Sequence, residues 1–195
     1  MPLTPAGAKT TGDQLSRTYS VADGIQHSVT ATSWADLSTI YTIPAGDAIP
    51  GPYNPTSVTY RLTSGGVGSW GNGESLQFRG AIGSNNVGAS GSSVDGSALA
   101  NGAAFRWWCE VILVVDVTGA SGSAAALLRG AIAESANNLI PGTAADNSVA
   151  FTAAVQAAGI NTTTPTTFSI QVQWGGSAGS PTVTSYLTLY EKLGG

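Results

Sequence analysis

The chain has 195 residues, of which 9% are charged and 42% are hydrophobic, and five are Trp and 26 are Gly. This apolar content argues against an intrinsically disordered chain, and the length suits one main domain. The net charge of −4, without any basic cluster, argues against nucleic acid or an anionic membrane as partner, because both require several neighbouring cations.

Residues 1–33 are predicted to form an extended N-terminal arm. They alternate small and polar residues without a sustained period, and they contain no apolar segment of the length found in signal peptides. We therefore expect no signal peptide. The rest of the chain, residues 34–195, is predicted to form a single domain.

That domain is predicted to consist of β-strands, because apolar residues recur at every second position between Gly- and Pro-rich turns. The strands are expected at residues 37–43, 57–62, 74–82, 105–117, 148–160, 167–174 and 182–193. The second and third of these are predicted to be neighbours, joined through a loop at residues 63–73. Residues 83–102, which are mostly Gly, Ser, Asn and Ala, are predicted to form a long loop.

The most apolar run of the chain is residues 105–117. Every second residue from Phe105 onward is apolar, and this row includes the single cysteine, Cys109. The other row contains Arg106, Glu110 and Asp116. A membrane-spanning helix needs about 20 mostly apolar residues, so we expect a long strand with one buried face and no membrane insertion. Cys109 is expected to pack as a small hydrophobic residue.

Residues 123–139 fit either a helix or a strand. Their Ala, Leu, Arg and Glu residues favour a helix, whereas Gly130 weakens one by about 1 kcal/mol, and alternate residues also fit a strand. Because strands flank the segment on both sides, we predict a strand. About eight strands at this spacing predict an all-β antiparallel sandwich or barrel.

No motif predicts a catalytic, cofactor or metal site. Residues 66–71 match the dinucleotide-binding pattern G-x-G-x-x-G, and residues 175–179 match the hydrolase pattern G-x-S-x-G around Ser177. Each is followed by a predicted strand instead of the helix that the chemistry requires. One His, one Cys and scattered acids offer no metal-ligand spacing. We expect a protein without enzymatic activity or cofactor; the enzymatic alternative is an esterase that uses Ser177 with His27 as its base.

Two tryptophans lie at the ends of predicted strands or loops, Trp70 and Trp174. At such a position an indole ring can stack on a sugar ring, or it can pack over the end of a sandwich. Both residues are therefore candidates for a carbohydrate-binding site.

Residues 38–51, the Gly- and Ser-rich middle of the chain and above all the ending FSIQVQWGGSAGSPTVTSYLTLYEKL resemble the single jelly-roll domain of bacteriophage virion proteins. These include minor capsid, decoration, head-fibre and tail-tip components. The similarity covers roughly residues 35–193. It implies a two-sheet jelly roll, a homotrimer like those of tumour-necrosis-factor domains, and no enzymatic activity. The Ala-rich segment 123–139 departs from the pattern of the family.

The resemblance implies a structural protein that decorates or stabilises a phage capsid, with the virion as its location and the major capsid protein or another virion protein as its partner. Tyr186 and Tyr190, on the predicted outer row of the last strand, and Trp108 are candidates for the trimer interface or ordinary surface residues. The N-terminal arm is predicted to attach the protein to the particle. The alternative function is a tail-tip or head-fibre module that binds host glycans through Trp70 or Trp174.

Overall fold

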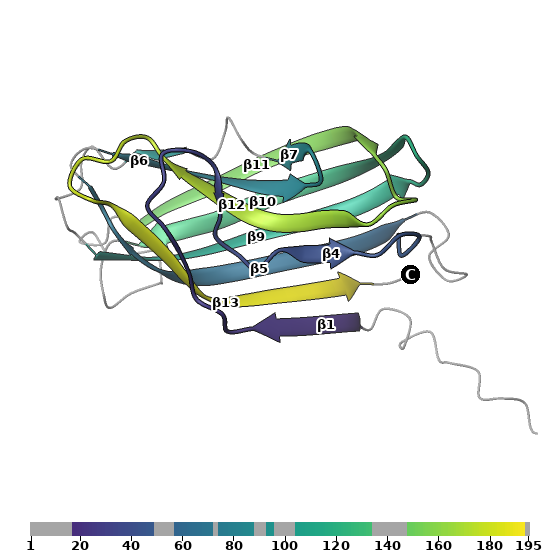
Figure 1. The fold of residues 1–195 in the computed structure, drawn as a ribbon, viewed down its shortest axis with the longest axis horizontal. Coiled ribbons are helices and arrows are strands. Elements are labelled where there is room, and N and C mark those ends of the chain that lie inside the picture. The colour runs from purple at the N-terminus through teal and green to yellow at the C-terminus, as the bar shows by residue number, and fades with distance from the viewer. Residues whose placement is uncertain are drawn as a thin grey trace, which may run out of the picture.

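A computed structural model defines residues 17–48, 57–71, 74–87, 93–95, 104–133 and 148–193 of the chain. Within these ranges there are thirteen strands and no helix. The strands form two antiparallel sheets that pack face to face (Figure 1). The predicted all-β antiparallel two-sheet sandwich is confirmed, and it contains more strands than the eight or so that we expected.

The larger sheet, sheet A, has seven strands. Their order is β1 (Arg17–Asp23), β13 (Thr182–Leu193), β5 (Val58–Ser69), β9 (Ala104–Val117), β10 (Gly122–Ala133) and β11 (Ser148–Ile160), and β2 (His27–Val29) also pairs with β13. Sheet B has six strands. Their order is β3 (Ala35–Asp36), β12 (Thr166–Trp174), β6 (Ser75–Ile82) and β7 (Asn85–Val87), while β4 (Tyr41–Ile43) pairs with β12 and β8 (Ser93–Asp95) pairs with β6.

The connections between the strands are of two kinds. The chain changes sheet between β2 and β3, β4 and β5, β5 and β6, β8 and β9, β11 and β12, and β12 and β13. In contrast, β9, β10 and β11 are consecutive neighbours within sheet A and form a meander. Because β6 pairs with β12 from Leu76 to Ile82, the prediction that it neighbours β5 is wrong; the two strands lie in opposite sheets.

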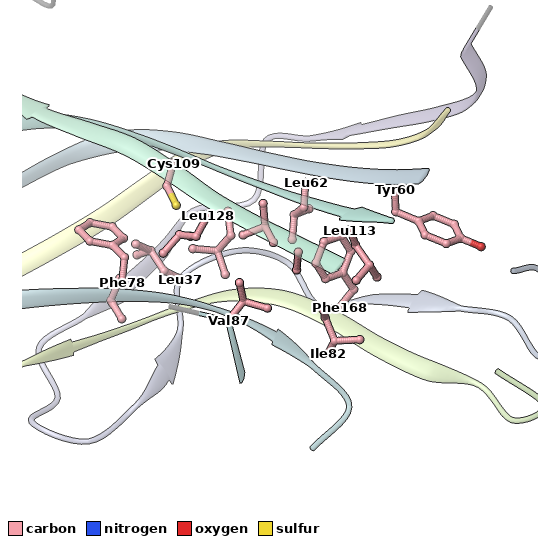
Figure 2. Close-up of a cluster of buried hydrophobic side chains, with 14 of the residues drawn as sticks. Leu37, Tyr60, Leu62, Phe78, Ile82, Val87, Cys109, Leu113, Leu128 and Phe168 are labelled. Atoms are coloured by element: carbon pink, nitrogen blue, oxygen red, sulfur yellow. The ribbon is translucent and has the colours of Figure 1, made fainter. Parts of the chain in front are cut away.

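The core lies between the sheets and follows the alternation seen in the sequence. In β9 the buried row is at most 2% exposed from Phe105 to Val115, and only its last member, Val117, is exposed. Figure 2 shows how the layers meet: Leu62, Cys109, Leu113 and Leu128 come from sheet A, and Phe78, Val87 and Phe168 come from sheet B. Burial, and then the charge of Glu110, raises the pKa of the Cys109 thiol, as expected for a cysteine that packs as a hydrophobic residue.

The segment that fits either a helix or a strand is a strand over its described part. Residues 122–133 form β10, which pairs with β9 on one side and β11 on the other, while Ala124, Leu128 and Ile132 point into the core. Pairing on both edges outweighs the helical propensity of Ala and Leu. Residues 134–139 lie outside the described residues.

The glycine-rich stretch after residue 62 was predicted to be a loop, but β5 continues through it to Ser69. A Cβ atom at Gly66 would lie 1.9 Å from the carbonyl oxygen of Thr184, and one at Gly68 would lie 2.2 Å from the ring of Phe105. Glycine in a strand often marks a close approach of neighbouring atoms, and this is the case here. The dinucleotide-like pattern therefore lies mostly within a strand and reflects packing.

Two further predictions need correction in sheet B. The loop predicted at residues 83–102 contains the short strands β7 and β8, which pair with β6; its remaining residues from 88 onward lie outside the described residues. Of the strand predicted at residues 37–43, only residues 41–43 form a strand, β4, and residues 37–40 lie between β3 and β4. There the backbone N–H groups of Leu37 and Ser38 both donate to the carbonyl oxygen of Ile170, at 2.8 and 3.3 Å.

The predicted N-terminal arm is part of sheet A from residue 17 onward. β1 pairs with β13 from Arg17 to Asp23, and β2 pairs with residues 183–185 of the same strand. The hydroxyl of Thr39 donates to the Asp23 carboxylate and thereby ties this segment to the region between β3 and β4. Residues 1–16 lie outside the described residues.

Candidate functional site

The face of sheet A that points away from sheet B is formed by alternate residues of β13, β5, β9, β10 and β11 (Figure 1). The register aligns these residues in rows that cross the strands. One row contains Leu187, Gly65, Trp108, Ala131 and Ala150; the next contains Leu189, Thr63, Glu110, Arg129 and Thr152; the third contains Glu191, Arg61, Ile112, Leu127 and Ala154.

Four large hydrophobic residues are exposed in and beside the first row: Val67, Trp108, Tyr186 and Leu187, which we call the aromatic patch. Trp108 is 38% exposed and Leu187 is 54% exposed, and the residue between them, Gly65, has no side chain to separate them. Eight large hydrophobic residues are exposed in the described part of the chain, and these are four of them. The patch is therefore a concentration of exposed apolar surface rather than scattered single residues.

A β-bulge in β13 creates part of this patch. Ser185 pairs with Gly66 and Leu187 pairs with Gly65, so Tyr186 is an extra residue without a cross-strand partner. One inserted residue exchanges the two faces of the strand beyond it. Leu187 and the residues at every second position after it consequently point outward, and Tyr190 points inward.

Tyr190 is accordingly buried, with 3% of its surface exposed. Its ring stacks on Tyr41, with the ring centroids 3.3 Å apart, and it also contacts the rings of Tyr60 and Phe168. Tyr190 cannot contact a second chain in this fold, so its assignment to a trimer interface is wrong. Tyr186 and Trp108 lie at the surface, where that assignment stays a prediction.

Trp70 and Trp174 are also buried, and neither exposes any surface on which a sugar ring could stack. Their rings pack edge to face with the centroids 5.6 Å apart, and Trp70 also packs on Phe105. The Trp174 indole N–H donates to the carbonyl oxygen of Val29, because the chain after β2 covers this end of the sandwich. The prediction that these residues form a carbohydrate site is wrong.

Beside the aromatic patch lies a charged cluster of Arg61, Glu110, Arg129 and Glu191. The Arg61 guanidinium contacts the Glu191 carboxylate directly and lies 3.8 Å from that of Glu110, and Arg129 Nε lies 2.5 Å from Glu110 Oε2. Glu110 is 6% exposed and Glu191 is fully buried, although both belong to the outer face. Two cations and two anions leave the cluster with no net formal charge.

Beyond the charged cluster, a shallow apolar groove that is open to solvent crosses β9, β10 and β11. Its lining consists of Ile112, Val114, Ala125, Ala126, Leu127, Ala154 and Val155. Ala126 and Val155 pair with each other on the row that faces the core, so the outward side chains of the groove are those of Ile112, Val114, Ala125, Leu127 and Ala154, which are all apolar. The outer face of sheet A therefore carries two apolar areas, separated by charges that are paired within the chain.

The candidate esterase residues are not brought together. Ser177 is exposed in the turn before β13, so a strand follows it and not a helix. His27 Nε2 lies 3.1 Å from the Thr39 hydroxyl, whose proton is donated to Asp23; this bond and the Ile25 amide lower the pKa of Asp23. In the described residues, no group of three or more His, Cys, Asp and Glu side chains is placed to hold a metal ion.

Sequence reasoning missed the charged cluster and the groove. The cluster comes from strands that are distant in the chain: Arg61 in β5, Glu110 in β9, Arg129 in β10 and Glu191 in β13. The groove comes from β9, β10 and β11, which follow one another in the chain. The two-residue period assigned Arg61 and Glu110 to the outer rows, but only the strand order brings them side by side. Co-variation between positions could have revealed these pairs, and a single sequence carries no such signal.

Comparison of the chain with models of known protein families, with curated proteins and with solved structures finds no match in any of the three. Over the ranges that the structure defines, no helix is long and apolar enough to span a membrane. The described residues define the class of the protein: an antiparallel β-sandwich with an aromatic patch and an apolar groove on one outer face.

Proposed function

We propose that the protein is a non-enzymatic structural component of a bacteriophage particle that decorates or stabilises the capsid as a homotrimer. The observation that carries the proposal is the outer face of sheet A, where the aromatic patch and the groove expose apolar side chains. Large exposed apolar areas on soluble domains usually mark contact surfaces. The trimer and the virion partner rest on the resemblance of residues 38–51 and 168–193 to phage jelly-roll proteins.

The electrostatics of this face favour contact with identical copies. The four charges of the cluster are neutralised within one chain, so the cluster itself adds no repulsion between like charges when two such faces approach each other. Two further charges of β9 lie on this face, Arg106 opposite Val67 and Asp116 near the end of the strand. The aromatic patch has the composition of an interface core, in which Trp and Tyr are enriched and charged residues are depleted. The glycan-binding alternative loses its support, because both of its candidate tryptophans are buried.

Replacing Trp108 by Asp is expected to convert the trimer to a monomer. Removing a central interface tryptophan costs about 2 kcal/mol or more, which raises the dissociation constant by about 30-fold or more, and the carboxylate adds a desolvation cost. Size-exclusion chromatography with light scattering measures the mass. Ile40→Asp is the matched control, because Ile40 is 51% exposed and lies between β3 and β4, two strands of sheet B. A monomeric wild-type chain would contradict the proposed trimer.

The virion role is tested on particles from the source that encodes the chain. Gold-labelled antibody against the protein is expected to decorate the particles in negative-stain images, and recovery of the chain only in the particle-free supernatant would contradict this role.

The proposed anchoring by the arm is tested by deleting residues 1–16, since a longer deletion would remove strands of sheet A. The deletion is expected to reduce occupancy on particles and leave the trimer mass, corrected for the missing residues, unchanged.

A further inference from the structure

We propose that the outer face of sheet B binds a sugar that carries a carboxylate, and that Arg79 holds this carboxylate. The inference goes beyond the proposed structural role and does not depend on it, and it concerns a different surface from the two buried tryptophans. The site consists of two rows of side chains that cross the strands. One row contains Asp36 of β3, Gln171 of β12 and Arg79 of β6, and the next contains Gln173 of β12 and Gln77 of β6.

The guanidinium of Arg79 is held in place from two sides. Its Nε donates to Gln171 Oε1 at 2.8 Å, and its central carbon lies 4.2 Å from the centroid of the Trp34 ring, a cation–π contact. Gln171 is held in turn, because its Nε2 donates at 3.0 Å to Asp36 Oδ1, which also accepts from the Ser169 hydroxyl at 2.7 Å. A guanidinium fixed in this way loses little further freedom when it binds a ligand, so it is preorganised.

The charge of Arg79 has no counter-ion among the residues that the structure describes. Its two terminal nitrogens have no hydrogen-bond partner there, and the guanidinium forms no ion pair, in contrast to the arginines of the charged cluster on sheet A. Burial lowers the pKa of the Arg79 guanidinium, and the charge of Asp36 partly opposes this change. An anion would stabilise such a half-buried cation, and the parallel N–H groups of a guanidinium match the two oxygens of a carboxylate.

The surroundings of Arg79 favour a single carboxylate with hydroxyl groups beside it. Asp36 would repel a second negative charge, which disfavours a phosphate dianion. Within the described ranges, Asp36 Oδ2 and the amides of Gln77 and Gln173 have no hydrogen-bond partner. The carboxylate oxygen can accept from a hydroxyl, and the amides, two residues or about 7 Å along the strands from the first row, can both donate and accept. These groups match the ring hydroxyls of an acidic sugar.

An acidic peptide matches this face less well than a sugar does. Extended peptides bind to sheets by adding a strand at an edge, where their main chain pairs with free N–H and C=O groups. β6 is paired with β12 on one side and with β7 and β8 on the other, and β12 is paired with β6 on one side and with β3 and β4 on the other. The site therefore lies in the middle of sheet B, where a ligand meets side chains only.

Saturation-transfer NMR with two matched sugars tests the proposal. Methyl β-glucuronide is expected to bind about tenfold or more tightly than methyl β-glucoside, which has a CH₂OH group in place of the carboxylate. Arg79→Gln is expected to weaken the binding of the glucuronide by about tenfold or more, and Arg79→Lys by less, because it keeps the charge but loses the paired N–H groups. Arg106→Gln is the matched control. Arg106 is an exposed arginine of sheet A without an ion pair in the described part of the chain, and its loss is expected to leave binding unchanged.

Three outcomes would overturn the inference: equal binding of the two sugars, full binding by Arg79→Gln, or a synthetic acidic peptide that binds as tightly as the glucuronide through Arg79. Circular dichroism checks that each variant keeps its β structure. Should Arg79→Gln fail to fold, the nearly isosteric Gln171→Glu replaces it; its carboxylate would pair with Arg79 and is expected to abolish binding of the glucuronide. All of these measurements concern a single subunit, so their outcome is independent of the trimer mass and of the labelling of particles.

Discussion

Replacing Tyr190 by Ala is expected to lower the free energy of unfolding by about 3–5 kcal/mol, the usual cost of removing a large aromatic side chain from a core. The ring is 3% exposed and stacks on Tyr41, and burial raises the pKa of its phenol, so a neutral side chain packs there. Guanidinium unfolding followed by tryptophan fluorescence measures the change. The measurement is made in the Trp108→Asp background, so that loss of subunit contact does not enter the difference.

Tyr186→Ala is the matched control in the same strand. Tyr186 is 50% exposed and occupies the bulge, so its removal is expected to change the stability by no more than about 0.5 kcal/mol. The sequence predicts the same outer row for both tyrosines, so a period of two predicts similar costs for the two variants. Equal costs would therefore show that β13 runs without the bulge.

The inner rows of most strands were predictable because alternation is a local property of the sequence. In β9, β6 and β12 the predicted row is the buried one, since each of these strands has one row with few polar residues. In β13 the rows of side chains point to the predicted faces only up to Ser185. Beyond the bulge both of its rows contain apolar or aromatic residues, so the composition of residues 187–193 gives no sign that the faces have been exchanged.

The pairing of strands was not predictable, because a single sequence states which residues are apolar but not which strand lies beside which. β5 and β6 read as a hairpin, yet they lie in opposite sheets. The same limitation explains the error at Trp70 and Trp174. Each follows or ends a strand and therefore resembles a loop residue, but the chain at residues 29–31 covers this end of the sandwich and buries Trp174.

Replacing Gly66 by Ala is expected to destabilise the protein by about 3 kcal/mol or more, at the upper end of the cost of overpacking. The added Cβ would lie 1.9 Å from the Thr184 carbonyl oxygen and 2.9 Å from Ser185 Cα, which are backbone atoms of the paired strand and cannot rotate away. The same carbonyl accepts a hydrogen bond from the Trp107 indole at 3.1 Å. Separation of β5 from β13 would break this bond, so the native tryptophan emission is expected to shift together with the unfolding midpoint.

Gly24→Ala is the matched control, because a Cβ atom at Gly24 meets nothing within 4 Å and its φ lies outside the left-handed region. This substitution is expected to leave the stability unchanged or to raise it by up to about 1 kcal/mol, through the lower entropy of the unfolded chain. If Gly66→Ala were equally mild, β5 and β13 would not approach each other as closely as described. The bulge opposite Gly65 and Gly66 would then lose its basis, and with it the outward position of Tyr186 and Leu187 on which the aromatic patch depends.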